Sequence, residues 1–294
     1  MKELEFVDYL TRKFKVKRPV VMGIGDDCAV LEHTRGKYML LTSDMLIEGV
    51  HFERNTAPFA IGWKAMAVNI SDIAAMGGVP EYALVSVGVP KKKNIKFLKK
   101  ITDGIEALCR KFDISVIGGD TNRAGKTVLS IALMGEVEKK RLITRSGARP
   151  GDLLFVTGKL GCGRVKHLSF LPRLREARIL GNFKISSMID LSDGLALDLN
   201  RLARASSVGA RVHKELIPIF GARGSFKEMI SRGEDFELLF TVSPGEAKKI
   251  MKHIRRKKDL AVTRIGEITR VLGVRIVEES GRSKLLKSRG FRHL

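Results

Sequence analysis

Half of the aspartates in this 294-residue chain lie in five short motifs, and each motif closes an apolar run. The motifs are Gly23-Ile-Gly-Asp-Asp27, Thr42-Ser-Asp44, Asn69-Ile-Ser-Asp72, Gly118-Gly-Asp120 and Asp190-Leu-Ser-Asp-Gly194. Carboxylates next to buried elements are costly, and grouped carboxylates repel one another unless cations lie between them. Mg²⁺ prefers hard oxygen ligands and bridges carboxylates to phosphates, so the pattern predicts a metal-dependent site for phosphoryl chemistry.

Taken alone, each motif also has a structural interpretation. Asp26 and Asp27 can form a metal or phosphate corner in a glycine-rich loop, or only a polar turn. The group Thr42, Ser43 and Asp44 can hold Mg²⁺ through oxygens, or cap a helix. These alternatives stay open for each motif by itself.

Two further motifs place carboxylates on helices. Asp72 lies inside an otherwise apolar helical run and shares a face with Asn69, so a buried Asp72 needs a partner such as a metal. Asp190 and Asp193 open a predicted helix at 192–206, where Ser192 is a natural N-cap. Free N–H groups at that helix start can also bind phosphate.

The segment Gly119–Thr127 resembles a phosphate-binding P-loop but has one residue too many between its glycines. A β-rich run follows it, whereas a P-loop precedes a helix, so we exclude a Walker-type nucleotidase. Asp120 remains a candidate metal ligand at a strand end. Glu234 and Asp235 can contact a cationic substrate or simply start a strand, and His51 by itself is typical of a structural histidine.

Composition predicts a globular protein of about two domains, because 44% of the residues are hydrophobic and no apolar run approaches the roughly 20 residues that span a bilayer. The charged N-terminus lacks a signal-peptide pattern. The three cysteines are scattered and form no C-x-x-C pair. We therefore expect a cytoplasmic protein without disulfides, structural zinc or a membrane partner.

The net charge of +22 raises the alternative of a nucleic-acid-binding protein. The basic runs, such as Lys91-Lys-Lys93 and Arg255-Arg-Lys-Lys258, are short, dispersed and mostly without interleaved aromatic residues. This pattern is typical of solvated surfaces, so we predict no specific nucleic-acid partner.

Hydrophobic periodicity alternates between helix and strand in both halves of the chain, which predicts an α+β or α/β protein with a boundary near residues 138–150. The predicted helices are 2–14, one from Pro58 to the Gly77-Gly78 pair, 93–112, 192–206 and one after Pro244. The predicted strands are 38–42, 82–89, 114–117, 128–135, 153–157, 187–189, 236–242 and 274–277.

Taken together and in order, the motifs resemble the thiamine-monophosphate kinase family, of the aminoimidazole-ribonucleotide-synthetase-like superfamily. The resemblance also includes Glu48-Gly-Val-His-Phe52, Thr144-Arg-Ser-Gly147 and Gly233-Glu-Asp-Phe-Glu237, and it spans nearly the whole chain. It implies ATP- and Mg²⁺-dependent phosphorylation of thiamine monophosphate to thiamine diphosphate. Other ATP-using members of the superfamily, such as aminoimidazole ribonucleotide synthetase, remain the alternative.

The resemblance implies an α+β fold with an N-terminal domain at 1–138, whose mixed sheet dimerises, and a sandwich-like α/β C-terminal domain at 139–294. It implies several Mg²⁺ ions with ligands at Asp27, Thr42, Ser43, Asp44, Asp72, Asp120, Asp190 and Asp193. It implies ATP contacts at Asp72, Gly119, Asp120, Arg145 and Ser192. It implies substrate contacts at His51, Glu234 and Phe291, and no protein nucleophile or general base.

Overall fold

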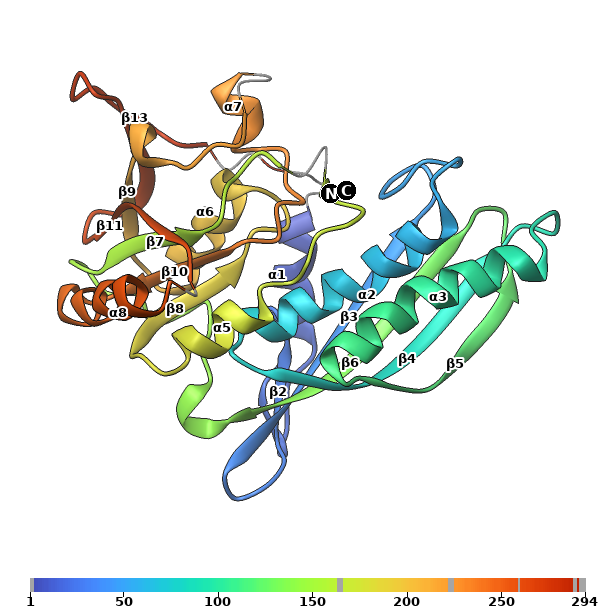
Figure 1. The fold of residues 1–294 in the computed structure, drawn as a ribbon. Helices are drawn as coiled ribbons and strands as arrows, with labels where there is room; N and C mark the ends of the chain where they lie inside the picture. Colours follow the sequence, from blue (N-terminus) through green and yellow to red (C-terminus); the bar gives the residue numbers. More distant parts are fainter. Residues whose placement is uncertain (1–2, 163–165, 222–224, 259, 288–289, 291–294) are drawn as a thin grey trace.

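The computed structural model describes residues 3–162, 166–221, 225–258, 260–287 and 290. Two separate β-sheets, each with helices against it, make up this part of the chain (Figure 1). The predicted α+β class is therefore confirmed, and both sheets are mixed. Among the described residues, no helix has the length and apolarity needed to cross a membrane.

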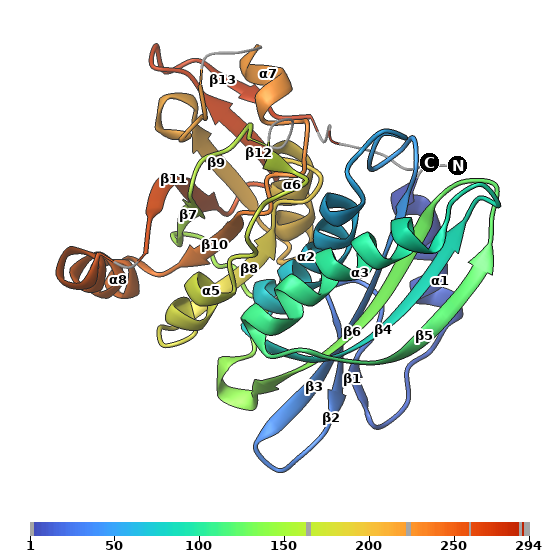
Figure 2. The same cartoon turned by 45° about the vertical axis from the view of Figure 1, so that its right-hand side comes forward.

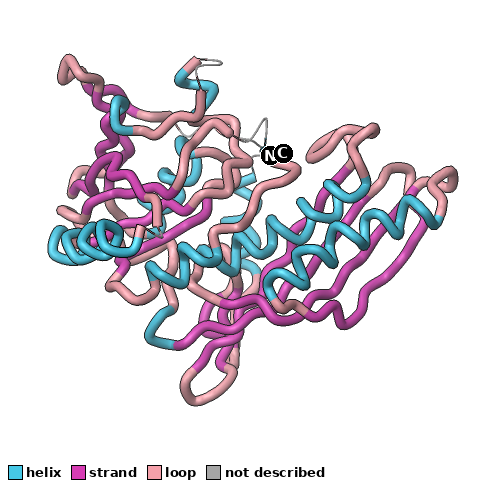
Figure 3. The backbone as a smooth tube through the Cα atoms, in the orientation of Figure 1, coloured by secondary structure: helices cyan, strands magenta, loops and turns pink. Residues whose placement is uncertain are grey.

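The first sheet has six strands in the order β1-β2-β3-β6-β4-β5. They are β1 (Val20–Met22), β2 (Ala29–Glu32), β3 (Lys37–Ile47), β4 (Val79–Val89), β5 (Ser115–Arg123) and β6 (Val128–Glu138). Neighbouring strands are antiparallel except β4 and β5, which are parallel. Helices α2 (Pro58–Ala75) and α3 (Ile95–Phe112) cover one face of this sheet, as the tube in Figure 3 also shows.

The opposite face of the first sheet carries neither α2 nor α3 (Figure 2). Side chains alternate between the two faces of a strand, so the residues between the buried ones point outward here. Met45, Tyr82 and Leu84 lie on this outer face, and each is between 42% and 53% exposed. An apolar sheet face left open to solvent is a candidate contact surface.

Helices α2 and α3 pack unusually closely because glycines meet at their crossing. A Cβ at Gly62 would lie 1.9 Å from the carbonyl oxygen of Ile101, and a Cβ at Gly104 would lie 2.0 Å from that of Phe59. Only glycine permits this backbone approach. The close packing fixes α2, which carries Asp72, against the sheet.

The second sheet has seven strands in the order β13-β12-β9-β11-β7-β10-β8. They are β7 (Leu153–Thr157), β8 (Ile185–Asp190), β9 (Gly209–His213), β10 (Leu238–Val242), β11 (Val262–Thr269), β12 (Gly273–Val277) and β13 (Ser283–Leu285). β9 and β12 pair in parallel, and the other described neighbours are antiparallel. Helix α6 (Leu195–Ala205) packs on one face, while α5 (Leu174–Leu180) and α8 (Pro244–Lys257) pack on the other.

Three short helices and one N-terminal helix complete the described chain. They are α1 (Glu3–Lys13), α7 (Phe226–Met229) and the 3-10 turns η1 (Lys139–Arg141) and η2 (Lys214–Leu216). Helix α2 is buried along most of its length, and its apolar core continues through Met188 and Phe240 into the second sheet. Asp72 on α2 is therefore close to both sheets.

Three local predictions were wrong. β3 continues to Ile47 because β6 pairs with it along its full length, so Thr42, Ser43 and Asp44 lie within a strand and cap no helix. β5 includes Gly118-Gly-Asp120 and is an exposed edge strand, whereas the strand predicted at 114–117 ends before them. Helix α6 begins at Leu195 with Gly194 as its N-cap residue, so Ser192 is not the cap.

Candidate functional site

A cavity of about 700 Å³ lies where β3, α2 and the end of β8 come together. Eleven of the predicted site residues line it: Asp27, Thr42, Ser43, Asp44, His51, Asp72, Arg145, Asp190, Ser192, Asp193 and Glu234. Gly119 and Asp120 are not among its lining residues. Phe291 lies outside the described residues.

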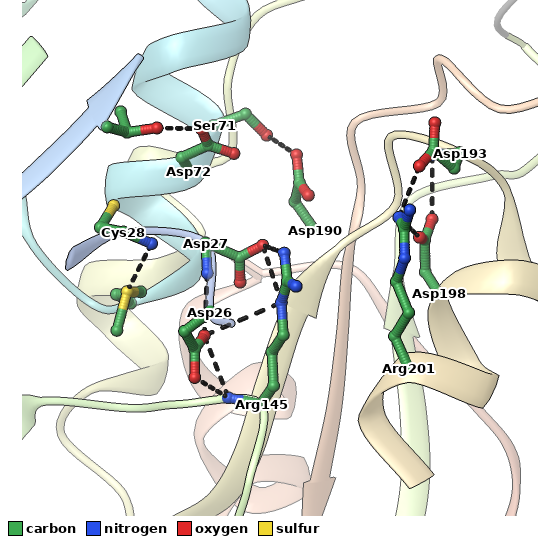
Figure 4. Close-up of polar contacts among 12 residues, drawn as sticks. Asp26, Asp27, Cys28, Ser71, Asp72, Arg145, Asp190, Asp193, Asp198 and Arg201 are labelled. Carbon is green, nitrogen blue, oxygen red and sulfur yellow. Dashed lines mark hydrogen bonds and ion pairs between the residues drawn. The ribbon is translucent and has the colours of Figure 1, made fainter. Parts of the chain in front are cut away.

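Three carboxylates from distant parts of the sequence form the centre of the site, here called the acidic cluster: Asp27, Asp72 and Asp190. One oxygen of each lies within 4.8 Å of one oxygen of the other two. Asp27 follows β1, Asp72 is on α2 and Asp190 ends β8, so both halves of the chain contribute (Figure 4). This spacing suits a shared cation.

Hydroxyl groups orient two carboxylates of the acidic cluster. Thr42 Oγ1 donates to Asp72 Oδ2 at 2.5 Å, and Ser71 Oγ donates to Asp190 Oδ2 at 2.7 Å. The backbone N–H of Asp44 donates to Asn69 Oδ1 at 3.0 Å, which ties β3 to α2 beside Asp72. Strand alternation places the side chains of Thr42 and Asp44 toward α2 and that of Ser43 toward the outer face.

Arg145 holds the loop that carries Asp26 and Asp27. Its guanidinium donates to Asp27 Oδ1 at 2.5 and 3.2 Å, and its backbone N–H donates to Asp26 Oδ2 at 3.0 Å (Figure 4). Burial alone lowers the pKa of Arg145, but the charges of Asp27 and Asp26 outweigh it and raise the pKa above its ordinary value. In this structure Arg145 therefore orients Asp27.

The acidic cluster carries more negative charge than its neighbours neutralise. Burial raises the pKa of Asp72 well above its usual range, and the nearby charges of Asp44 and Asp190 raise it further. Burial and the charge of Asp27 likewise raise the pKa of Asp190. Burial, with the charge of Asp27, raises the pKa of Asp26 to about 7.

One atom of the acidic cluster is buried and unsatisfied. Asp27 Oδ2 has no hydrogen-bond partner among the described residues, although buried carboxylate oxygens are normally paired. An orphan oxygen, two hydroxyl-oriented carboxylates and raised carboxyl pKa values are together what a divalent cation would satisfy. The residues present therefore fit Mg²⁺.

Asp193 lines the same cavity but lies apart from the acidic cluster (Figure 4). Arg201 donates to Asp193 Oδ2 at 2.5 Å and to Asp198 Oδ1 at 2.9 Å, and the backbone N–H of Asp193 donates to Asp198 Oδ2. Burial and the charge of Asp193 raise the pKa of Asp198 to about 7. The predicted ligand Asp193 is thus engaged by an arginine.

Asp120 cannot join the acidic cluster of its own chain. Its strand position pairs with Ser86, which pairs with Ser130, which pairs with Met45 on the outer face. β6 and β4 lie between β3 and β5, so three strand spacings, about 14 Å, separate Asp120 from the strand that carries Asp44. The two side chains also lie on opposite faces of the sheet. The carboxylate accepts hydrogen bonds from its own neighbours Thr121 and Asn122.

The two described residues predicted to bind substrate meet at a buried lysine. Lys64 Nζ donates to the backbone carbonyl of His51 at 2.7 Å and forms an ion pair with Glu234. His51 Nδ1 accepts a hydrogen bond from the backbone N–H of Ile47 at 3.0 Å. Glu234 precedes β10, where the sequence allowed either a substrate contact or a strand start, and the strand itself begins only at Leu238.

Sequence reasoning missed Lys64, Ser71 and Phe236 as cavity or cluster residues. Lys64 had a usable signal, since it is a lone charge between Trp63 and Ala65 on the apolar part of a helix. Ser71 had none, because its partner Asp190 is 119 residues away. Phe236 stacks on Phe170 with ring centroids 4.0 Å apart, a contact that only the tertiary structure creates.

Comparison with known proteins defines the class to which this fold and site belong. The profile of the AIR synthase related protein, N-terminal domain, matches residues 25–137, and that of its C-terminal domain matches residues 164–278. The chain is therefore a two-domain protein of the AIR synthase related class.

The chain belongs, more narrowly, to the thiamine-monophosphate kinase family. It is 33% identical to the thiamine-monophosphate kinase of Bacillus subtilis, over 100% of this chain and 99% of that protein. It is 35% identical to the enzyme of Rhodopirellula baltica, over 90% of this chain and 89% of that protein. The solved structure of AaThiL complexed with AMPPCP and TMP matches with 30% identity and a TM-score of 0.86, covering 100% of this chain and 97% of that chain.

Proposed function

We propose that this protein transfers the γ-phosphate of ATP to the phosphate of thiamine monophosphate, forming thiamine diphosphate. The observation that carries the proposal is that one cavity is lined both by the acidic cluster and by Glu234 and His51. A phosphoryl donor and an organic acceptor can therefore meet in one place. Family membership over the full chain, and a similar structure that holds AMPPCP and TMP, support this assignment.

Asp27, Asp72 and Asp190 are the residues that would hold Mg²⁺, with Thr42, Ser43, Asp44 and Asp193 beside them. Bound Mg²⁺ supplies charge neutralisation for the phosphates of both anionic reactants. The protein's own part is to keep these oxygens in place. Thr42 and Ser71 do so by hydrogen bonds, and Arg145 does so by its paired bonds to Asp27.

No side chain is required as nucleophile or base. The terminal phosphate oxygen of the acceptor is already ionised near neutral pH and can attack phosphorus in line once it is positioned. His51, the histidine nearest the predicted motifs, uses its Nδ1 to accept from a backbone N–H, which is a structural hydrogen bond. Positioning and electrostatics therefore account for the chemistry.

We further propose that the working protein is a homodimer of chains with domains at 1–138 and 139–294. Asp120 lies on the outer face of the first sheet, Gly119 precedes it on the same edge strand, and neither residue lines the cavity of its own chain. That face also exposes Met45, Tyr82 and Leu84. Pairing two such faces would bury the apolar side chains and bring Asp120 of one copy toward the nucleotide held by the other. Asp72, Arg145 and Ser192 are the remaining proposed ATP contacts.

Acceptor specificity tests the proposed function. The purified protein is incubated with γ-labelled ATP and Mg²⁺, and with thiamine monophosphate, thiamine or no acceptor. Label should appear in thiamine diphosphate only with the monophosphate. Label that is released as free phosphate without acceptor, with none in thiamine diphosphate, would move the protein to a different ATP-using reaction.

A further inference from the structure

Lys64 is a fully buried cation in the wall of the active cavity. Its side chain is 1% exposed, although it lies on α2 and lines the same cavity as the acidic cluster. Burying an ammonium group is costly unless it is paired. Accordingly, burial lowers the pKa of Lys64, while the charge and hydrogen bond of Glu234 act in the opposite direction.

The partners of Lys64 come from both halves of the chain. The backbone carbonyl of His51 accepts from Nζ at 2.7 Å, and Glu234 Oε1 forms the ion pair. His167 Nδ1 lies 2.9 Å from Lys64 Nζ and 3.0 Å from Glu234 Oε2. Since an ammonium group only donates, His167 Nδ1 either accepts from Lys64 or donates to Glu234. In both cases the Glu234 carboxylate lies between Lys64 Nζ and His167 Nδ1.

Glu234 is kept in place by its backbone as well. It has a φ of 60°, and Phe236 has a φ of 49°, in the left-handed region that costs energy for residues other than glycine. The backbone N–H of Glu234 donates to the backbone carbonyl of Ser192 at 2.6 Å, and that of Phe236 donates to the backbone carbonyl of Leu191 at 2.9 Å. These bonds hold a strained segment so that the Glu234 side chain points at Lys64.

Stability alone does not account for this ion pair. A buried ion pair is seldom more stabilising than apolar residues of similar size, because both ions must lose their hydration. Here the pair borders the cavity. Glu234 is a predicted substrate contact, and Lys64 also donates to the backbone carbonyl of His51, the other described one. The charge of Glu234 remains available, since Lys64 and His167 lower its pKa despite burial, which acts to raise it.

We infer that Lys64 is a positioning residue for the organic part of the acceptor. Through its ion pair it keeps the Glu234 carboxylate ionised and aimed into the cavity, and through the His51 carbonyl it fixes the loop after β3. This inference rests on the proposed function. Within the described residues, Lys64 Nζ contacts His51, His167 and Glu234 and none of the acidic cluster. It therefore acts on the acceptor and leaves the nucleotide site unchanged.

Steady-state kinetics of Lys64→Met test the inference. KM for thiamine monophosphate should rise about tenfold or more, as expected for losing a hydrogen bond to a charged group, while KM for ATP stays within about twofold. Trp63→Phe is the matched control on the same helix. It removes the 2.8 Å bond from Trp63 Nε1 to the Phe170 carbonyl, next to the same cavity wall, without touching Glu234. Its KM for thiamine monophosphate should not change.

A double variant shows whether Lys64 acts through Glu234. Lys64→Met together with Glu234→Gln leaves neither charge buried alone, so it should fold even if Lys64→Met does not. Its KM for thiamine monophosphate should equal that of Glu234→Gln within about twofold. Multiplicative effects in the double variant, equal rises in both KM values for Lys64→Met, or the same rise in Trp63→Phe would each overturn the inference. Failure of the proposed function differs from all of these, because the unmodified protein would then form no thiamine diphosphate.

Discussion

Replacing Asp72 by asparagine should stabilise the metal-free protein while removing its response to Mg²⁺. Asp72 is buried beside Asp27 and Asp190, with oxygens within 4.8 Å of each other. At an effective dielectric constant of about 20, two unit charges at that distance repel by roughly 3.5 kcal/mol. Asparagine keeps an acceptor for Thr42 Oγ1 and removes the charge.

The net gain is smaller than the sum of these repulsions because the cluster takes up protons. Burial and neighbouring charges raise the pKa of Asp72, so the folded protein favours its protonated form. The contribution of the Asp72 carboxyl to the free energy of unfolding is then fully present below the ordinary carboxyl pKa, and it is lost as pH rises through the raised pKa. We expect a gain of about 1–3 kcal/mol near pH 8, or a few degrees in Tm, and less near pH 5.

Thermal melts in EDTA and in Mg²⁺ measure both effects. The unmodified protein should melt at higher temperature with Mg²⁺, and Asp72→Asn should show little change. Asp103→Asn, an exposed position on α3, is the matched control and should behave like the unmodified protein. If Asp72→Asn melts several degrees lower in EDTA, or keeps the full Mg²⁺ response, the electrostatic argument for the acidic cluster is wrong.

Three further predictions concern the dimer, the metal and the helix packing. Asp120→Asn and Asp72→Asn should each be nearly inactive but folded, and refolding a mixture should restore about a quarter of the activity, because about half of the dimers are mixed and each of those has one intact site. No recovery would place Asp120 in its own chain's site. Mg²⁺ affinity should increase between about pH 6 and pH 8 with net proton release, because the cation competes with protons on Asp190, whose pKa is raised, and on Asp26, whose pKa is raised to about 7. Calorimetry in buffers of different ionisation enthalpy measures the proton release, and pH-independent binding would contradict the prediction. Gly104→Ala should lower the free energy of unfolding by about 1–3 kcal/mol, because its Cβ would meet the Phe59 carbonyl, and an unchanged denaturant midpoint would count against close α2–α3 packing.

The acidic cluster was predictable from the sequence because each carboxylate is attached to an apolar element. Asp72 interrupts a buried helix and Asp190 ends a buried strand, and burial there requires compensation. The grouping of Asp27 with them followed from the ordered family motifs. Its pairing with Arg145, 118 residues away, was not readable from local pattern.

Elements were missed where local signals are weak. β9 and β11 carry charged residues and a glycine among few apolar ones. They form strands because they pair with each other, and because β11 also pairs with β7 and β9 with β12. α5 has only seven residues, too few for a helical period to be evident. The position of Asp120 on an exposed edge strand was also hidden, because an apolar run has the same sequence pattern in a covered strand and in an exposed one.

Formation of thiamine diphosphate by the purified protein tests the central claim most directly. Chromatography after incubation with ATP, Mg²⁺ and thiamine monophosphate should detect thiamine diphosphate and ADP in equal amounts, and neither product with EDTA or with Asp72→Asn. ATP consumption without thiamine diphosphate, or thiamine diphosphate formed equally well in EDTA, would contradict the account.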